Sequence, residues 1–137
     1  MSERGISIVE ILVGIFILSI FLYSFSFGIS DRLIQLKNDS IAYSVKNSLE
    51  WVRVYSIYKG ERLKVKFGKD IFKIYKYESG KWKWFKDLYF PGVELRANNS
   101  PIFYPYGTVS NLFSLYVEKD GFIRKITMNI NGKITIK

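Results

Sequence analysis

The sequence predicts an α+β fold, one long N-terminal α-helix followed by antiparallel β-strands, on three observations. Residues 11–58 hold an apolar run and then apolar residues spaced close to 3.6 apart, the period of an α-helix. From Glu61 onward, apolar and charged residues alternate, which is the period of a β-strand. Asp120-Gly121 and Asn131-Gly132 are typical hairpin turns. A chain of 137 residues has room for one domain and a short extra element.

The first element is an apolar stretch at residues 11–28, in which no residue carries a charge. As an α-helix it would be roughly 27 Å long, close to the hydrocarbon thickness of a bilayer. Arg4 and Gly5 precede this stretch, whereas a secretory signal has its small-residue cleavage site after the apolar region. We therefore expect one membrane helix that is retained in the mature protein.

The residues from Arg4 to Val13 resemble the type III signal of type IV prepilins and pseudopilins. The shared pattern is a basic residue and a glycine, then a hydrophobic residue, with a glutamate at the fifth position after the cut, here Glu10. The resemblance implies that a prepilin peptidase cleaves between Gly5 and Ile6 and that Ile6 is N-methylated. Residues 1–5 would then be a leader peptide.

Glu10 is an acidic residue inside an apolar segment, where a carboxylate costs about 2.5–3.5 kcal/mol at the bilayer centre and less near its edge. Cleavage after Gly5 would free an ammonium group at Ile6, which lies on the same helix face as Glu10. In a filament of parallel helices, the amine of a neighbouring subunit would instead approach Glu10 and set the axial register. Hydration of Glu10 by headgroup water is the simpler alternative.

Residues 31–58 predict an amphipathic helix that continues the membrane helix. Their apolar residues lie close to a 3.6-residue period, at positions 33, 34, 36, 41, 45, 49, 52 and 54. Lys59-Gly60 predicts the end of this helix, because glycine is favoured just past a helix C-terminus. The whole helix would be about fifty residues long.

The alternating pattern after the helix predicts short strands at residues 63–67, 71–77, 82–90, 93–97, 102–104, 112–117, 122–130 and 133–136. Turns between them are indicated by Gly, Pro, Asn and Asp. Because the last hairpin signals follow one another along the chain, we expect the C-terminal third to be an antiparallel meander.

Three downstream segments are similar to the GspH and FimT pilins: Leu49–Ile57, with Arg53 near the helix end, Phe103–Gly107, and Ile126–Lys137. This resemblance implies a helix packed against two antiparallel β-sheets. It also implies a minor subunit of a type II secretion pseudopilus or of a type IV pilus. The implied organisation is a leader peptide, a transmembrane and assembly helix, an amphipathic helix and a β-rich domain, at residues 1–5, 6–30, 31–59 and 60–137.

The partners implied by the resemblance are other pilins, contacted through the N-terminal helix, together with the prepilin peptidase and the inner membrane. The N-terminus would lie in the cytoplasm and the C-terminal domain in the periplasm. The protein would then leave the membrane for a periplasmic or surface filament.

The chain is basic, with 21 Lys and Arg against 12 Asp and Glu, and the excess lies from Asp31 onward. Such a balance suits nucleic acid or anionic lipid as a partner, and it also serves ordinary solubility. FimT-type pilins that act in competence bind DNA through a basic tail. By this resemblance, DNA binding is an alternative function, through a basic end made of Arg124, Lys125, Lys133 and Lys137.

Other motifs have structural interpretations that we favour. Arg53 near a helix C-terminus complements the helix dipole, and Phe103-x-Pro105-x-Gly107 is typical of a strand end and a turn. Residues 81–86 interleave lysine with aromatic residues. This pattern fits a surface for single-stranded nucleic acid, but we favour a half-buried strand with one solvated lysine face.

The chain contains no cysteine and no histidine. Thiolate nucleophiles, histidine bases, disulfides and the usual zinc ligands are therefore excluded, and no convergent pair of acidic residues is evident. We expect no catalytic residue, no metal site, no cofactor and no small-molecule substrate. The predicted role is that of a structural subunit rather than an enzyme.

Overall fold

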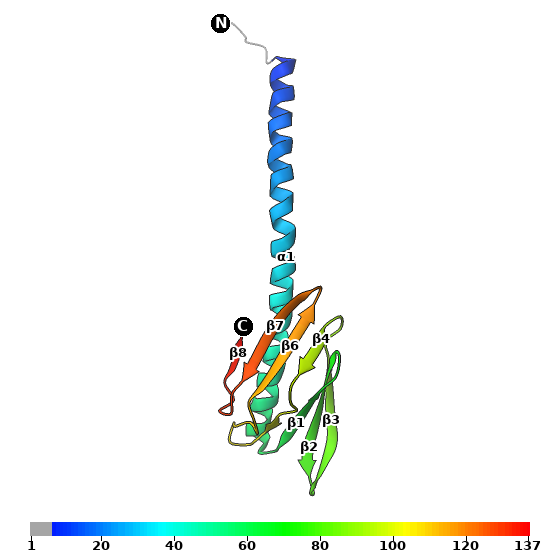
Figure 1. Cartoon of the computed structure of the whole chain (residues 1–137), viewed down its shortest axis with the longest axis vertical. Coiled ribbons are helices and arrows are strands. Elements are labelled where there is room, and N and C mark those ends of the chain that lie inside the picture. Colours follow the sequence, from blue (N-terminus) through cyan, green and yellow to red (C-terminus); the bar gives the residue numbers. More distant parts are fainter. Residues whose placement is uncertain (1–6) are drawn as a thin grey trace. The chain divides into compact units, whose positions relative to one another are not determined.

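The computed structural model describes residues 7–137, except for the side chains of residues 26–28. One α-helix, α1 (Ile8–Lys59), is followed in the described part of the chain by eight β-strands (Figure 1). The strands are β1 (Leu63–Phe67), β2 (Ile71–Glu78), β3 (Lys81–Tyr89), β4 (Glu94–Ala97), β5 (Ile102–Phe103), β6 (Phe113–Lys119), β7 (Phe122–Met128) and β8 (Ile134–Ile136). The predicted α+β class is confirmed, and each predicted strand is present.

The chain divides into two compact units, Met1–Lys37 and Asn38–Lys137. In the first unit the apolar side chains of α1 from Ile8 to Phe25 are exposed in the single chain. By length and composition, α1 is apolar enough to cross a membrane. The hydroxyl of Ser19 donates a hydrogen bond to the Ile15 carbonyl oxygen at 2.8 Å, which satisfies that polar group inside the helix itself.

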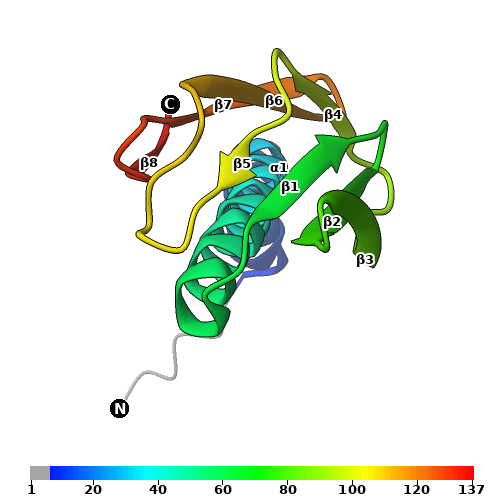
Figure 2. The same ribbon diagram turned by 90° about the horizontal axis from the view of Figure 1, so that it is seen from below.

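The second unit contains two four-stranded antiparallel sheets (Figure 2). We call them the first sheet, with strand order β3-β2-β1-β5, and the second sheet, with strand order β4-β6-β7-β8. In the second sheet β6, β7 and β8 pair in sequence order, so the predicted C-terminal meander is confirmed. Strand β5 lies between β4 and β6 in sequence and joins the first sheet by pairing with β1.

The core of the second unit is formed by one face of α1 and the inner faces of both sheets. The buried helix residues follow one another at intervals of three and four, which places them on one stripe: Ala42, Val45, Leu49, Val52 and Ser56. Phe67 joins the sheets, with ring centroids 4.9 Å from Phe72 and 5.7 Å from Phe113. Full burial of a Val, Leu or Phe side chain such as Val45, Leu49 or Phe72 contributes about 1.5–3 kcal/mol.

Part of the predicted apolar face of the helix is not buried. Leu33, Ile34 and Leu36 precede Asn38, the first buried residue among the helix side chains that the structure describes, and Val54 lies on the solvent side. A 3.6-residue period identifies a helix, but it does not tell which apolar residues a domain covers.

A β-bulge shifts the register between β2 and β3. Ile74 is opposite Lys86 while Tyr75 is opposite Trp84, so Phe85 is the extra residue. The Phe85 ring packs inward, with its centroid 5.2 Å from that of Tyr55 on α1. The bulge therefore changes which side chains of β3 face the core.

Two hairpins turn through positive backbone φ angles. Ser79-Gly80 and Asp120-Gly121 each have two successive positive φ values, as a two-residue type I′ turn requires. The hairpin at Asn131-Gly132 has a longer loop, in which the Asn129 N–H bonds to the Lys133 carbonyl oxygen at 3.1 Å. Only Gly132 is left-handed there, so this Asn-Gly pair ends a wider turn.

Candidate functional site

The predicted cleavage site, Gly5-Ile6, lies outside the described residues. Glu10 lies in the first turn of α1 with its side chain exposed. The carbonyl oxygen of Ser7 accepts the Glu10 N–H at 2.9 Å, and the Ser7 hydroxyl oxygen accepts the Val9 N–H at 3.4 Å. Ser7 is therefore the N-cap of the helix.

The N-cap gives Glu10 a local role that the sequence analysis missed. Ser7 and Glu10 have the S-x-x-E spacing of a capping box, and an acidic group in the first turn complements the positive end of the helix dipole. The signal was present in the sequence. Because the Glu10 carboxylate is exposed, a cation from outside the chain can also reach it.

Arg53 connects the end of α1 to two distant turns. Its Nε donates to the Gly107 carbonyl oxygen at 2.9 Å, and its Nη2 donates to the Asn131 carbonyl oxygen at 3.3 Å. Gly132 lies beside this contact, and a Cβ atom there would be 2.6 Å from the Gly107 oxygen. We call Arg53, Gly107, Asn131 and Gly132 the arginine clamp.

The arginine clamp brings together three motifs that are far apart in the sequence. The helix arginine, the turn at Gly107 and the hairpin glycine meet at one place. The hydrogen bonds give Arg53 a structural role, but its partners lie 54 and 78 residues away in sequence. Helix-dipole complementarity alone did not predict them.

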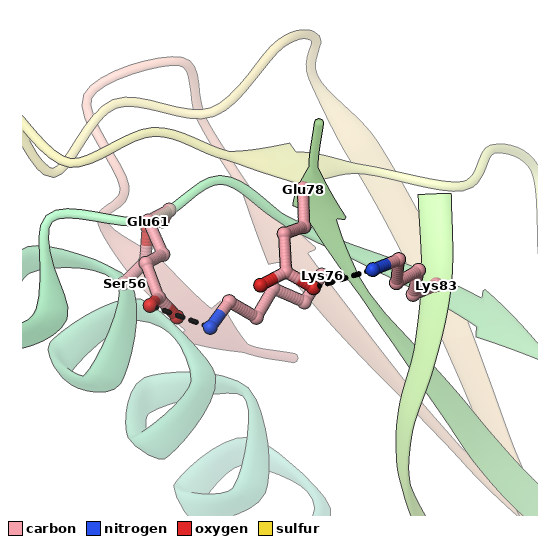
Figure 3. A network of polar contacts seen from close by, with 5 residues as sticks. All are labelled: Ser56, Glu61, Lys76, Glu78 and Lys83. Atoms are coloured by element: carbon pink, nitrogen blue, oxygen red, sulfur yellow. Dashed lines mark hydrogen bonds and ion pairs between the residues drawn. The ribbon is translucent and has the colours of Figure 1, made fainter. Parts of the chain in front are cut away.

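A polar network lies where α1 ends beside the first sheet (Figure 3). The buried Ser56 hydroxyl lies 2.6 Å from the Glu61 carbonyl oxygen, to which it donates. Lys76 Nζ lies 2.7 Å from Glu61 Oε1, and this hydrogen bond raises the pKa of Lys76 above its ordinary value. Lys83 Nζ lies 3.0 Å from Glu78 Oε2 and lowers the pKa of that carboxyl group.

Each of the two acids in this network is paired with a lysine. The bonds join the helix end and the segment before β1 to β2, and β2 to β3. Among residues 7–137, no group of three or more His, Cys, Asp or Glu side chains is placed to hold a metal ion.

The four predicted DNA-binding residues do not all lie together. Arg124 faces α1, where its Nε donates to Asp39 Oδ1 at 2.7 Å, and this bond raises the pKa of Arg124. Lys125, the next residue in β7, faces the opposite side and pairs through its backbone with Lys137. Lys133 lies at the turn end of the β7–β8 hairpin.

The structure instead gathers cations and aromatic rings on the outer face of the first sheet. Trp84 is 64% exposed there, and Lys64 Nζ lies 5.8 Å from the ring centroid of Trp82. Our prediction of a strand at residues 81–86 is confirmed, but its favoured burial pattern is wrong for Trp84. The cause is the bulge, which turns Phe85 inward and leaves Trp84 outward.

Comparison with known proteins gives one structural match and no match in sequence. No protein-family model and no curated protein matches the chain. Among solved structures, the chain is similar to the type IV minor pilin FimU of Pseudomonas aeruginosa strain PAO1, with a TM-score of 0.60 and 14% sequence identity. The match covers 75% of this chain and 90% of that one. The chain therefore has a pilin-type fold.

Proposed function

We propose that the protein is a minor pilin or pseudopilin, a structural subunit of a type II secretion pseudopilus or of a type IV pilus tip or initiation complex. The proposal rests on the difference in exposure between the first and the last part of α1. Its apolar side chains are exposed from Ile8 to Phe25, whereas its later turns pack into a pilin-type domain. An exposed apolar helix needs lipid or other helices around it, and assembly into a filament exchanges the first for the second.

The processing steps belong to the same proposal. A prepilin peptidase cuts between Gly5 and Ile6 on the cytoplasmic side of the inner membrane, and Ile6 becomes the methylated N-terminus. The domain that follows the membrane helix then lies in the periplasm.

Glu10 sets the register between subunits in this proposal. Its carboxylate is exposed in the first helical turn, within reach of a cation supplied from outside the chain. The ammonium group at Ile6 of a neighbouring subunit is such a cation, and two charges removed from water attract each other strongly. The work of the protein is mechanical assembly rather than catalysis.

The test is replacement of Glu10 by Ala in the native host. We expect normal membrane insertion and normal leader removal, measured by membrane fractionation and by mass spectrometry of the N-terminus. Incorporation into filaments, measured in sheared filament fractions, should fall at least about 10-fold, because an interaction of about 1.4 kcal/mol or more is removed at each contact.

Glu50→Ala is the matched control, because Glu50 is also a helix glutamate but lies in the domain, paired with Lys46 at 3.4 Å. It should leave incorporation unchanged. Wild-type incorporation of the Glu10→Ala protein would sink the register role.

The alternative of DNA binding through Arg124, Lys125, Lys133 and Lys137 stays a prediction. The proximity of Lys125 to Lys137 favours it, and the ion pair of Arg124 with Asp39 removes one cation from it. The charge-removal experiment below compares this basic end with a different surface.

A further inference from the structure

The outer face of the first sheet gathers lysine, arginine and aromatic side chains from neighbouring strands. Within β1, Leu63 and Val65 are fully buried, so the alternating Lys64 and Lys66 point outward. We call this surface the basic–aromatic face, and its main members are Arg62, Lys64, Lys66, Tyr75, Trp82 and Trp84.

Cations and rings alternate across this face. Lys64 is opposite Tyr75, which is opposite Trp84 on the next strand. Lys66 Nζ lies 5.2 Å from the ring centroid of Tyr75. The Arg62 guanidinium carbon lies 5.8 Å from the ring centroids of both Tyr77 and Tyr104. The cations are therefore held in place beside planar groups.

Carboxylates are few on this surface. At the outward strand positions of β1, β2 and β3, Asp87 is the acidic residue, opposite Lys73. Its Oδ1 accepts a hydrogen bond from Trp84 Nε1 at 2.9 Å, which fixes the orientation of the indole ring. Glu78 is held by Lys83 within the network at the helix end. The positive charge of Lys64 and Lys66 is thus left for an outside partner.

The exposure of Trp84 has a structural cause. The bulge at Phe85 directs two successive β3 side chains, Phe85 and Lys86, toward α1 and leaves the Trp84 ring in solvent. Tryptophan and tyrosine are enriched on surfaces where proteins bind other molecules. Bulges commonly occur where a side chain is re-aimed for such a purpose.

The arrangement selects the chemistry of the partner. Clustered lysine and arginine side chains fit a polyanion, and exposed tryptophan and tyrosine rings fit planar groups that can stack on them. A duplex hides its base faces, whereas an extended single strand presents them one by one.

We propose that the basic–aromatic face binds single-stranded nucleic acid, with phosphates beside Lys64 and Lys66 and bases stacked on Trp84 and Trp82. This binding is separate from filament assembly and needs neither Glu10 nor the membrane helix. Sequence preference is not expected, because every base has a face that stacks.

The test uses the full chain in non-ionic detergent and a fluorescent oligothymidylate, with binding followed by anisotropy at several salt concentrations. Trp84→Ala should weaken binding about 10-fold, because stacking on one ring is lost, without changing the salt dependence. The double variant K64Q/K66Q should weaken binding and reduce the slope of log affinity against log salt by about 1.4, or about 0.7 for each lost phosphate contact.

Matched ligands and variants make the result specific. An abasic oligomer with the same number of phosphates should bind about 10-fold more weakly than oligothymidylate, since it has no bases to stack. K69Q/K119Q removes the same charge near Asp70, Glu94 and Glu118, away from the basic–aromatic face, and should bind like the wild type. Circular dichroism of each variant checks that it is folded.

Three outcomes would overturn the proposal. Equal affinity for a duplex of the same length, or for the abasic oligomer, would show that stacking plays no part. Unchanged binding by Trp84→Ala in a folded protein would do the same. A loss confined to K125Q/K137Q would instead assign binding to the basic end of the second sheet.

Discussion

The two sheets of the second unit share one design on their inner faces and differ on their outer faces. On the outer face of the second sheet, polar groups satisfy one another: Arg96 Nη2 lies 2.9 Å from Glu94 and 3.6 Å from Glu118, and the hydroxyls of Thr127 and Thr135 are 2.7 Å apart. That face also has a cation–ring contact, Lys125 Nζ at 5.5 Å from the ring centroid of Tyr116. On the first sheet several such contacts lie side by side, and the exposed Trp84 ring is added to them. A face that neutralises itself suits water, whereas a face with free positive charge and exposed rings suits a partner.

The inner faces should prove equivalent, and this is the largest expected effect. Phe72 in the first sheet and Phe113 in the second are both fully buried. Replacement of either by Ala should lower the free energy of unfolding by about 3–5 kcal/mol, because a large cavity is left. Urea unfolding of the full chain in detergent measures this. A much smaller loss at one of them would mean that the two sheets do not share one core.

The second sheet depends on the arginine clamp, and Gly132→Ala tests that dependence. Gly132 has a φ of +79°, and its new Cβ would lie 2.6 Å from the Gly107 oxygen. We expect a loss of at least about 1–3 kcal/mol in the free energy of unfolding, from backbone strain with a steric clash added. Gly121→Ala is the matched control.

Gly121 has the same φ of +79° with open space around it, so its replacement reports strain alone. Equal losses of unfolding free energy at Gly132 and Gly121 would mean that the arginine clamp makes room for the new Cβ atom at no cost in stability.

The outer faces differ in what a cation contributes to stability. Arg96→Gln removes two carboxylate contacts and should lower the free energy of unfolding by about 0.5 kcal/mol, because the pairs are exposed. Lys64→Gln should change it less, since Lys64 contacts the Trp82 ring instead. Thermal unfolding of both variants decides this, and a larger loss at Lys64 would reverse the distinction drawn between the faces.

The smallest effect concerns pH at the edge of the first sheet. The hydrogen bond from Lys83 holds the pKa of Glu78 below its ordinary value. The ion pair therefore stabilises the fold fully at pH values above the ordinary pKa of a glutamate. This contribution is lost as the pH falls through the lowered pKa. In Lys83→Gln the pKa of Glu78 should rise toward its ordinary value, measured by NMR of the carboxyl carbon. No rise would mean that the ion pair does not form in solution.

Most of the fold could be predicted from the sequence, because helix and strand periods are local properties. Residues 11–58 gave the helix, and alternation gave each strand with small errors at the ends. What could not be predicted depends on contacts distant in sequence. The partners of Arg53 lie in turns that the pattern identified only as turns.

The candidate site divides in the same way. The resemblance predicts roles for Gly5, Ile6 and Glu10, and these stay predictions. The S-x-x-E spacing from Ser7 was readable in the sequence. The interleaved pattern at residues 81–86 fits a surface for single-stranded nucleic acid, but the sequence does not tell which of the adjacent aromatic residues Trp84 and Phe85 faces the core. The pairing of β2 with β3 places the bulge at Phe85 and Trp84 on the outer face.

The arginine clamp also has a consequence for the order of events during synthesis. Arg53 is made before its partners, because Gly107 and Asn131 follow it by 54 and 78 residues. The apolar first part of α1 is therefore made long before the end of α1 can be fixed to the sheets. Closing such a long loop is slow, so the domain should reach its final packing after α1 has formed.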